Sequence, residues 1–164
     1  MERLLFAIMF LAALGSGLIA GLFFVFSITV MAALHRLAPV IGISAMQSIN
    51  VTILSPVFLS VFMGTAVLCA LLLIVVFTRL STPGAGFVVI GAAFYLIGVI
   101  GVTMLFNVPL NRVLAAMDPQ NTNAAKLWTG YVSVWNGWNH VRTVSALSTL
   151  TSFILAIRAW PAPI

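Results

Sequence analysis

The chain has 164 residues, of which 63% are hydrophobic and 5% are charged, whereas soluble domains average about 25% charged residues. With Glu2 and Asp118 as its only acidic residues, it cannot surround a core with mixed charge, so a water-soluble globular fold is excluded and the surface must face lipid. The seven Lys and Arg residues stand singly along the chain, which excludes a nucleic-acid-binding patch and is typical of anchors at a membrane interface.

Four apolar runs predict an all-α, integral membrane four-helix bundle with kinked helices and a polar cluster at one membrane face. The length predicts a single domain, residues 1–164. The expected spans cover residues 4–34, 53–79, 86–106 and 138–160.

The first span stays uncharged from Leu4 to Leu34, too long for a cleaved signal peptide. Gly17 and Gly21 lie four residues apart, a spacing that lets another helix approach closely. That helix belongs either to this chain or to a second copy, so a homo-oligomer through glycine-rich helix faces is one expectation. The sequence His35-Arg36-Leu-Ala-Pro39 ends the span.

The second helix is predicted to begin at Ser44, which has the spacing of a capping box with Gln47. It is expected to run through Asn50 into the apolar stretch, with a kink at Pro56, and to end near Arg79.

A short turn at residues 81–84 makes the second and third spans antiparallel neighbours. Three glycines in the third span predict close helix contacts: Gly91, Gly98 and Gly101. Pro109 lacks a backbone donor, so the helix is expected to bend or break there.

After a polar loop at residues 118–123, a helical pattern runs from Ala124 to Trp160. At 1.5 Å per residue it would be about 55 Å long, more than one bilayer crossing requires. Its first part should stand above the membrane, lie along it, or bend at Gly130 or Gly137.

Four spans place both termini on one side of the membrane. The basic residues divide almost evenly between the two sides, so the positive-inside rule does not orient the chain. If Arg112 and Arg142 serve a site rather than topology, the termini are cytoplasmic, and a bacterial inner membrane is the expected location.

The unusual polar residues gather on the side opposite the termini, where four helix ends converge. Polar groups near lipid are costly unless paired, so such a cluster is a candidate site. The alternative is a belt of interfacial anchors and helix caps. The cluster comprises His35, Gln47, Asn50, Asn107, Asn111, Trp135, Asn139, His140 and Arg142.

On the last helix, five residues fall within about 40° of one direction at 100° per residue: Trp128, Trp135, Asn139, Arg142 and Ala146. Indole rings with amide and guanidinium donors suit a flat, partly anionic molecule. Arg142 is the predicted electrostatic centre of a small-molecule site, with the amide oxygens of Asn107, Asn111 and Asn139 as its protein partners.

The sequence offers little support for a metal site, because His, Cys and carboxylates are too few. No cofactor is required by the sequence. Haem bound through His35 or His140, with a Met as second ligand, stays open.

Several motifs together resemble the anthrone-oxygenase-like family of small four-helix membrane proteins. They are Phe23-Phe-Val-Phe-Ser27, Gln47-Ser-Ile-Asn50, Phe106-Asn-Val-Pro-Leu-Asn111 and Trp135-Asn-Gly-Trp-Asn-His-Val-Arg142. For its fungal members, this resemblance implies oxidation of an anthrone, a flat tricyclic ketone, to an anthraquinone with molecular oxygen. Most bacterial members have no known activity.

In such a reaction a base removes a proton and donors stabilise the enolate, without a metal being required. His35 or His140 would be the base, and Trp135 the stacking surface. Arg142, Asn139, Asn107 and Asn111 would be the donors, with Gln47 and Asn50 completing a polar chamber. Two other functions stay open: a non-catalytic carrier for a lipophilic ligand or haem, and a structural subunit of a membrane complex.

Overall fold

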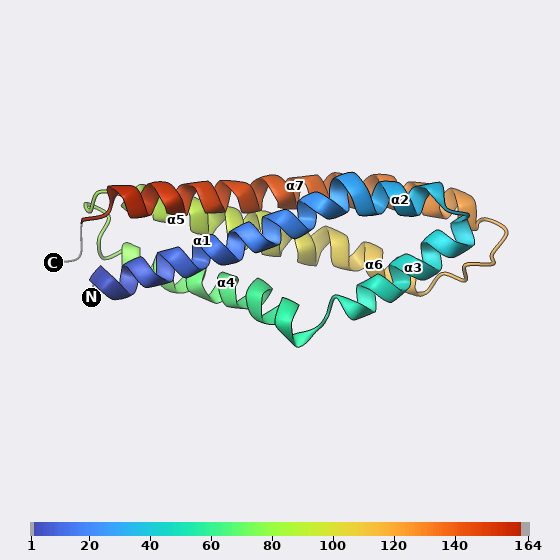
Figure 1. The fold of residues 1–164 in the computed structure, drawn as a ribbon, viewed down its shortest axis with the longest axis horizontal. Coiled ribbons are helices and arrows are strands. Elements are labelled where there is room, and N and C mark those ends of the chain that lie inside the picture. The colour runs from blue at the N-terminus through green and yellow to red at the C-terminus, as the bar shows by residue number, and fades with distance from the viewer. Residues whose placement is uncertain (1, 162–164) are drawn as a thin grey trace.

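A computed structural model describes residues 2–161. Within them, four helical spans are long and apolar enough to cross a membrane: Glu2–Arg36, Pro56–Val76, Ala85–Ala115 and Ala124–Ala159. The spans lie side by side along one long axis (Figure 1). The predicted all-α membrane bundle is therefore confirmed.

The first span is one long helix with a π-helical segment inside it. It comprises α1 (Glu2–Val25), η1 (Phe26–Val30) and α2 (Met31–Arg36). The π-helical turns interrupt the regular hydrogen-bond ladder without ending the helix. Its most extensive packing is against the last helix.

The second segment is two helices that meet at an elbow. α3 (Pro39–Thr52) and α4 (Pro56–Val76) diverge on either side of Ile53–Ser55, and the elbow projects sideways from the bundle (Figure 1). The prediction of one continuous, kinked helix is wrong. A proline at the start of each helix explains the break, since proline fits the first helical turn and lacks the donor that an interior position needs.

The caps of these two helices also differ from the prediction. α3 begins at Pro39, before Ser44, whose hydroxyl donates within the helix to the Val40 carbonyl at 2.8 Å. The proposed capping box is therefore wrong. The cap lies instead at Ser55, whose Oγ accepts a hydrogen bond from the Phe58 backbone N–H at 3.3 Å.

The third span comprises α5 (Ala85–Ala93), η2 (Phe94–Gly101), η3 (Thr103–Asn107) and α6 (Val108–Ala115). The helix does not break at Pro109, which occupies the first turn of α6. The irregularity appears before it, as π-helical turns. Gly84 precedes α5 with φ 90°, a left-handed conformation that favours glycine.

The fourth span, α7 (Ala124–Ala159), is one unbroken helix of 36 residues. The predicted alternative of a bend at Gly130 or Gly137 is wrong. At about 54 Å it exceeds a hydrocarbon core of about 30 Å, so its first turns extend beyond the core beside α2, α3 and α6.

Two buried clusters hold the bundle together. The larger one fills the space between the four spans and includes Tyr95 and Phe153, both fully buried. The smaller cluster lies toward the loop at residues 116–123: Met31, Leu34, Ile43, Met46, Leu114, Ala124, Trp128, Tyr131 and Trp135.

Glycines permit close contacts between the third and fourth spans. A Cβ on Gly98 would lie 2.6 Å from the Ser145 Cβ, and one on Gly91 would lie 3.0 Å from the Ser152 Cβ. These two predicted close contacts are confirmed. A Cβ added to Gly17 would lie 3.6 Å from a Leu150 methyl, an ordinary contact, and one added to Gly21 would meet no other described atom within 4 Å. No close helix approach within the described chain requires these two glycines, and a contact with a second copy stays a prediction.

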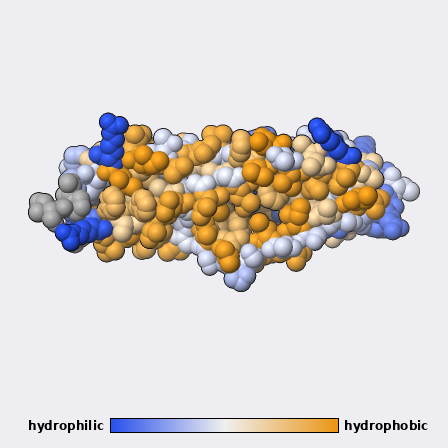
Figure 2. Space-filling model, in the orientation of Figure 1, coloured by the Kyte–Doolittle hydropathy of each residue, from blue (hydrophilic) through white to orange (hydrophobic). Residues whose placement is uncertain are grey.

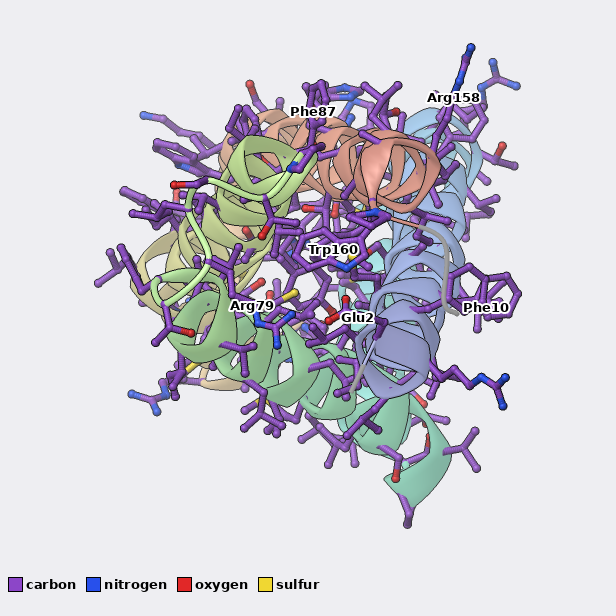
Figure 3. The ribbon with its side chains drawn as sticks, turned by 90° about the vertical axis from the view of Figure 1, so that its left-hand side faces the viewer. Glu2, Phe10, Arg79, Phe87, Arg158 and Trp160 are labelled. Carbon is purple, nitrogen blue, oxygen red and sulfur yellow. The ribbon has the colours of Figure 1, made fainter. Side chains whose placement is uncertain are left out.

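On the face shown in Figure 2, the surface is mostly apolar along the middle of the bundle, with hydrophilic residues at the two ends and on the lower projection. At one end, the Glu2 carboxylate accepts hydrogen bonds from the Arg79 guanidinium and from Trp160 Nε1, at 2.5 and 2.7 Å, and these side chains point toward one another in Figure 3. The start of α1 and the end of α7 therefore lie together at this end of the bundle.

Candidate small-molecule site

The elbow between α3 and α4 projects from the bundle (Figure 1). Residues of the elbow and of all four spans line a cavity of about 240 Å³. Its wall is mostly apolar and aromatic, with polar side chains at Asn50, Thr103, Asn111 and Arg142. All four spans contribute to the wall. The apolar and aromatic lining comprises Leu22, Phe23, Phe26, Met46, Ile49, Ile53, Leu54, Phe58, Leu59, Phe62, Met63, Met104, Val108 and Trp135.

Arg142 places a buried positive charge in this wall, with 6% of its surface exposed. Its guanidinium donates to Asn139 Oδ1 at 2.6 Å and, more weakly, to Thr103 Oγ1 at 3.4 Å. It also lies 4.2 Å from the Phe23 ring centre and 5.1 Å from that of Trp135. Its Nε has no hydrogen-bond partner.

Within residues 2–161, no carboxylate forms an ion pair with Arg142. Buried charges are normally paired, because removing an ion from water costs several kcal/mol. Neutral amide and hydroxyl groups and ring faces offset only part of this cost. The cavity is therefore electrostatically suited to an anion.

Asn139 fixes the position of the guanidinium. Its Nδ2 donates to the Phe23 carbonyl and to Ser27 Oγ, both at 2.7 Å, which leaves Oδ1 facing Arg142. Asn136 donates to the Ser27 carbonyl at 3.1 Å. These contacts join α7 to the first span at η1, and π-helical turns are frequent at functional sites.

Asn111 connects α6 to an aromatic ladder on α7. Its Oδ1 accepts hydrogen bonds from Tyr131 Oη at 2.9 Å and from Trp135 Nε1 at 2.8 Å. Both bonds use the oxygen, so the NH2 group of Asn111, a residue that lines the cavity, is available to donate to a ligand. The ladder continues from Tyr131 to Trp128, whose rings stack with centres 5.6 Å apart.

Asn50 brings a second amide to the cavity from α3. Its Nδ2 is buried, and its approach to the Tyr131 hydroxyl is a hydrogen bond of poor geometry. A buried donor that is poorly paired loses part of the free energy of a good hydrogen bond. Because Asn50 lines the cavity, a rotation of its side chain would bring this donor to a ligand oxygen.

The structure divides the predicted site residues into groups. Asn50, Asn111, Trp135 and Arg142 line the cavity. Asn139 lies behind Arg142, and Asn107 lies behind the wall, with its Nδ2 donating to the Trp135 carbonyl at 3.2 Å. Among the three amides expected to accept from Arg142, only Asn139 does so.

The other three predicted residues lie outside the cavity wall. Gln47 donates to the carbonyls of Leu114 and Met117, at 2.8 and 2.9 Å, and so caps the end of α6. His35 and His140 are both exposed, and neither lines the cavity. The structure therefore does not bring either imidazole to Arg142.

The predicted inward face of α7 is confirmed, because each of its five members is buried: Trp128, Trp135, Asn139, Arg142 and Ala146.

Comparison with known protein families gives a match: the family model described as anthrone oxygenase matches residues 58–152, more than half of the chain. No curated protein and no solved structure showed significant similarity to the chain.

The chain belongs to the anthrone oxygenase family. The match covers the parts of α4 and α7 that border the cavity and the whole third span. Of the cavity residues described above, it includes Asn111, Trp135 and Arg142, whereas Phe23 and Asn50 precede it. In this anthrone oxygenase family member, the first span and α3 therefore complete a site whose positive charge comes from the matched region.

Sequence reasoning missed three contributors to the site in this family member. Tyr131 could have been found, because it lies on the same helical face as Trp128 and Trp135. Ser27 and Thr103 carry no pattern that separates them from other small polar residues in apolar helices. Within residues 2–161, no group of three or more His, Cys, Asp or Glu side chains is placed to hold a metal ion.

Proposed function

We propose that the cavity binds a flat, lipophilic molecule that carries an acidic or enolisable oxygen. The observation that carries this proposal is Arg142, a buried guanidinium without a carboxylate partner in the described chain. The other polar residues that line the cavity include Asn50 and Asn111, whose NH2 groups can act as donors. An anionic oxygen matches this set, because charge-assisted hydrogen bonds are the strong ones.

The apolar lining supports a flat and largely aromatic ligand. Phe23 and Trp135 both present rings to the guanidinium, and no other residue of the described cavity wall carries a charge. Aromatic walls contribute through area burial and ring contacts. A charge-delocalised enolate combines both requirements, because its oxygen binds the donors while its rings contact the apolar wall.

For the reaction, the family supports an oxygenase acting on an anthrone-type ketone. The ketone methylene loses two hydrogens and gains one oxygen atom from O2, and the second oxygen atom leaves as water. Arg142 would hold the enolate oxygen, with Asn50 and Asn111 as further donors, and Trp135 would orient the ring system. The delocalised carbanion would be the species that reacts with O2.

No histidine, lysine or carboxylate lines the cavity among residues 2–161. The role of base predicted for His35 or His140 therefore has no support from their positions. In this proposal the ligand gives its proton to water at the membrane interface, and Arg142 favours the ionised form by binding it.

The test is anthrone oxidation in proteoliposomes, followed by O2 consumption and anthraquinone absorbance. Wild type should exceed protein-free vesicles, and Arg142→Lys should reduce the rate because it keeps the charge and loses the planar fork. Arg112→Lys is the matched control, since Arg112 is exposed on α6 at the same end of the bundle. Wild-type rates equal to those of empty vesicles would refute the oxygenase activity.

A non-catalytic carrier of the same ligand class is the second candidate. The absence of a base from the described cavity wall favours it, since binding needs only Arg142, the amides and the apolar wall. Arg142-dependent binding without O2 consumption would identify a carrier. A structural subunit would show neither.

We also propose an orientation in the membrane. Both termini would lie on the cytoplasmic side of a bacterial inner membrane, and the end of the bundle nearer the cavity would face the other side. Gly21 is exposed, and a Cβ added to it would meet no other described atom within 4 Å, so we propose it as the point where a second copy packs in a homo-oligomer. Crosslinking of a Gly21→Cys variant tests this contact.

A further inference from the structure

One side of the cavity wall is exposed on the outside of the bundle. Leu54 at the elbow, Met63 on α4 and Met104 on η3 line the cavity and are 60%, 49% and 58% exposed. By contrast, Arg142 on the inner side is 6% exposed. The cavity therefore opens between α4 and the third span, and its rim is apolar.

Both ends of the bundle are closed above and below the cavity. Toward the loop at residues 116–123, Met46, Leu114 and Trp128 belong to the smaller buried cluster, and each is at most 1% exposed. Toward the Glu2 end, Phe62 and Tyr95 are 6% and 0% exposed, and the Tyr95 hydroxyl donates to the Phe62 carbonyl at 3.0 Å. No exposed wall residue leads along the bundle axis.

The rim lies at the depth of the hydrocarbon. α4 has 21 residues and is about 31 Å long, which matches a hydrocarbon core of about 30 Å. Its first residue, Pro56, thus lies near one edge of the core, and Met63 lies about 10 Å deeper. The opening faces acyl chains, with the headgroup region at the elbow.

We infer that the ligand reaches Arg142 sideways from the bilayer, through the gap between α4 and η3, with Met63 and Met104 as its gate. The unbranched, polarisable Met side chains can move aside for ligands of different outline. This inference rests on the proposed function and narrows its substrate class to molecules dissolved in the membrane. A strongly hydrated, multiply charged analogue should not use this route.

The test measures uptake of 2-hydroxyanthraquinone, a stable flat phenol, from phosphatidylcholine bilayers. Binding is followed through the absorption change when its phenol ionises, in nanodiscs that contain the whole protein. The double variant Met63→Trp/Met104→Trp should slow uptake by on the order of tenfold, because the gate must then rearrange before the ligand passes. Release of bound ligand should slow together with uptake, because both pass the same gate, whereas a pair that only weakened the wall contacts of Met63 and Met104 would speed release.

Val67→Trp and Leu105→Trp are matched controls, because both residues are exposed on the same helices and neither lines the cavity. They should leave the rate unchanged. Met63→Ala/Met104→Ala widens the gate and should speed uptake, and it provides a second test should the Trp pair fold poorly.

Two results would overturn the inference in different ways. Equal uptake rates in wild type and both gate variants, with binding still dependent on Arg142, would remove the lateral route and leave the proposed function intact. Absence of any Arg142-dependent binding in wild type would remove both.

Discussion

Replacing Arg142 with Met should change the stability of the unliganded protein little while greatly weakening ligand binding. Met keeps much of the apolar volume of the side chain and removes the charge. The two outcomes differ because the guanidinium is buried at 6% exposure and has only neutral partners.

The magnitude follows from the contacts. The bond to Asn139 at 2.6 Å is charge-assisted and worth about 1.5–3 kcal/mol, and leaving Asn139 Oδ1 unpaired costs about 1–3 kcal/mol. The two ring contacts add about 0.5–2 kcal/mol. Met also removes the cost of keeping an ion buried, which is several kcal/mol and offsets these losses. Because these losses and this gain are of similar size, the net change in unfolding free energy is expected to lie within about 3 kcal/mol of zero, in either direction.

Thermal unfolding in detergent measures the stability, and absorbance titration with 2-hydroxyanthraquinone measures binding. Loss of a buried charge partner should cost the ligand about 2–5 kcal/mol, a factor of roughly 30 to 4,000 in Kd. A variant that unfolds more easily by over about 3 kcal/mol would show that Arg142 is structural, because it would exceed the value of the Asn139 bond. Unchanged affinity would refute the site.

The other predictions concern an amide, helix packing and topology. Asn50→Leu should weaken binding of the same probe by about 1–3 kcal/mol without lowering stability, since its Nδ2 has no good partner in the free protein; stronger binding would contradict this. Gly98→Ala should destabilise by about 1–3 kcal/mol because its Cβ meets Ser145, whereas Gly130→Ala, with open space around it, should stabilise by up to about 1 kcal/mol; equal effects on thermal unfolding would argue against the close contact. Cysteines at Arg3 and Arg158 should react with an impermeant maleimide from one side of the membrane and a cysteine at Asn121 from the other; labels at the first two positions that react from opposite sides would rule out the topology.

The fold could be predicted from composition because each span exceeds the length that a bilayer requires, and the short turn at residues 81–84 fixes the second and third spans as neighbours. Local backbone was harder to predict. Pro56 and Pro109 both looked like kinks inside helices, yet each lies in the first turn of a helix, and the difference depends on which neighbours satisfy the preceding carbonyls. The capping-box spacing at Ser44 was misleading because Gln47 caps α6 instead.

The site was predictable where helical periodicity decides direction. The 100° helical repeat predicts that Trp135, Asn139 and Arg142 share one inward face. All three side chains are buried, which confirms this. Asn50 was also grouped with the site from the sequence and lines the cavity, whereas the positions of Thr103 and Phe23 depend on how the π-helical turns orient two other helices, which no local spacing encodes. His35 and His140 were grouped with the site by membrane depth, although each side chain points outward.

The most direct test of the central claim is an experimental structure of the protein in nanodiscs with 2-hydroxyanthraquinone. The account predicts ligand density in the cavity beside the elbow, with its ionised oxygen within hydrogen-bond distance of the Arg142 guanidinium and its rings against Trp135 and Phe23. An empty cavity at saturating ligand, or an Arg142 side chain directed to bulk water, would contradict it.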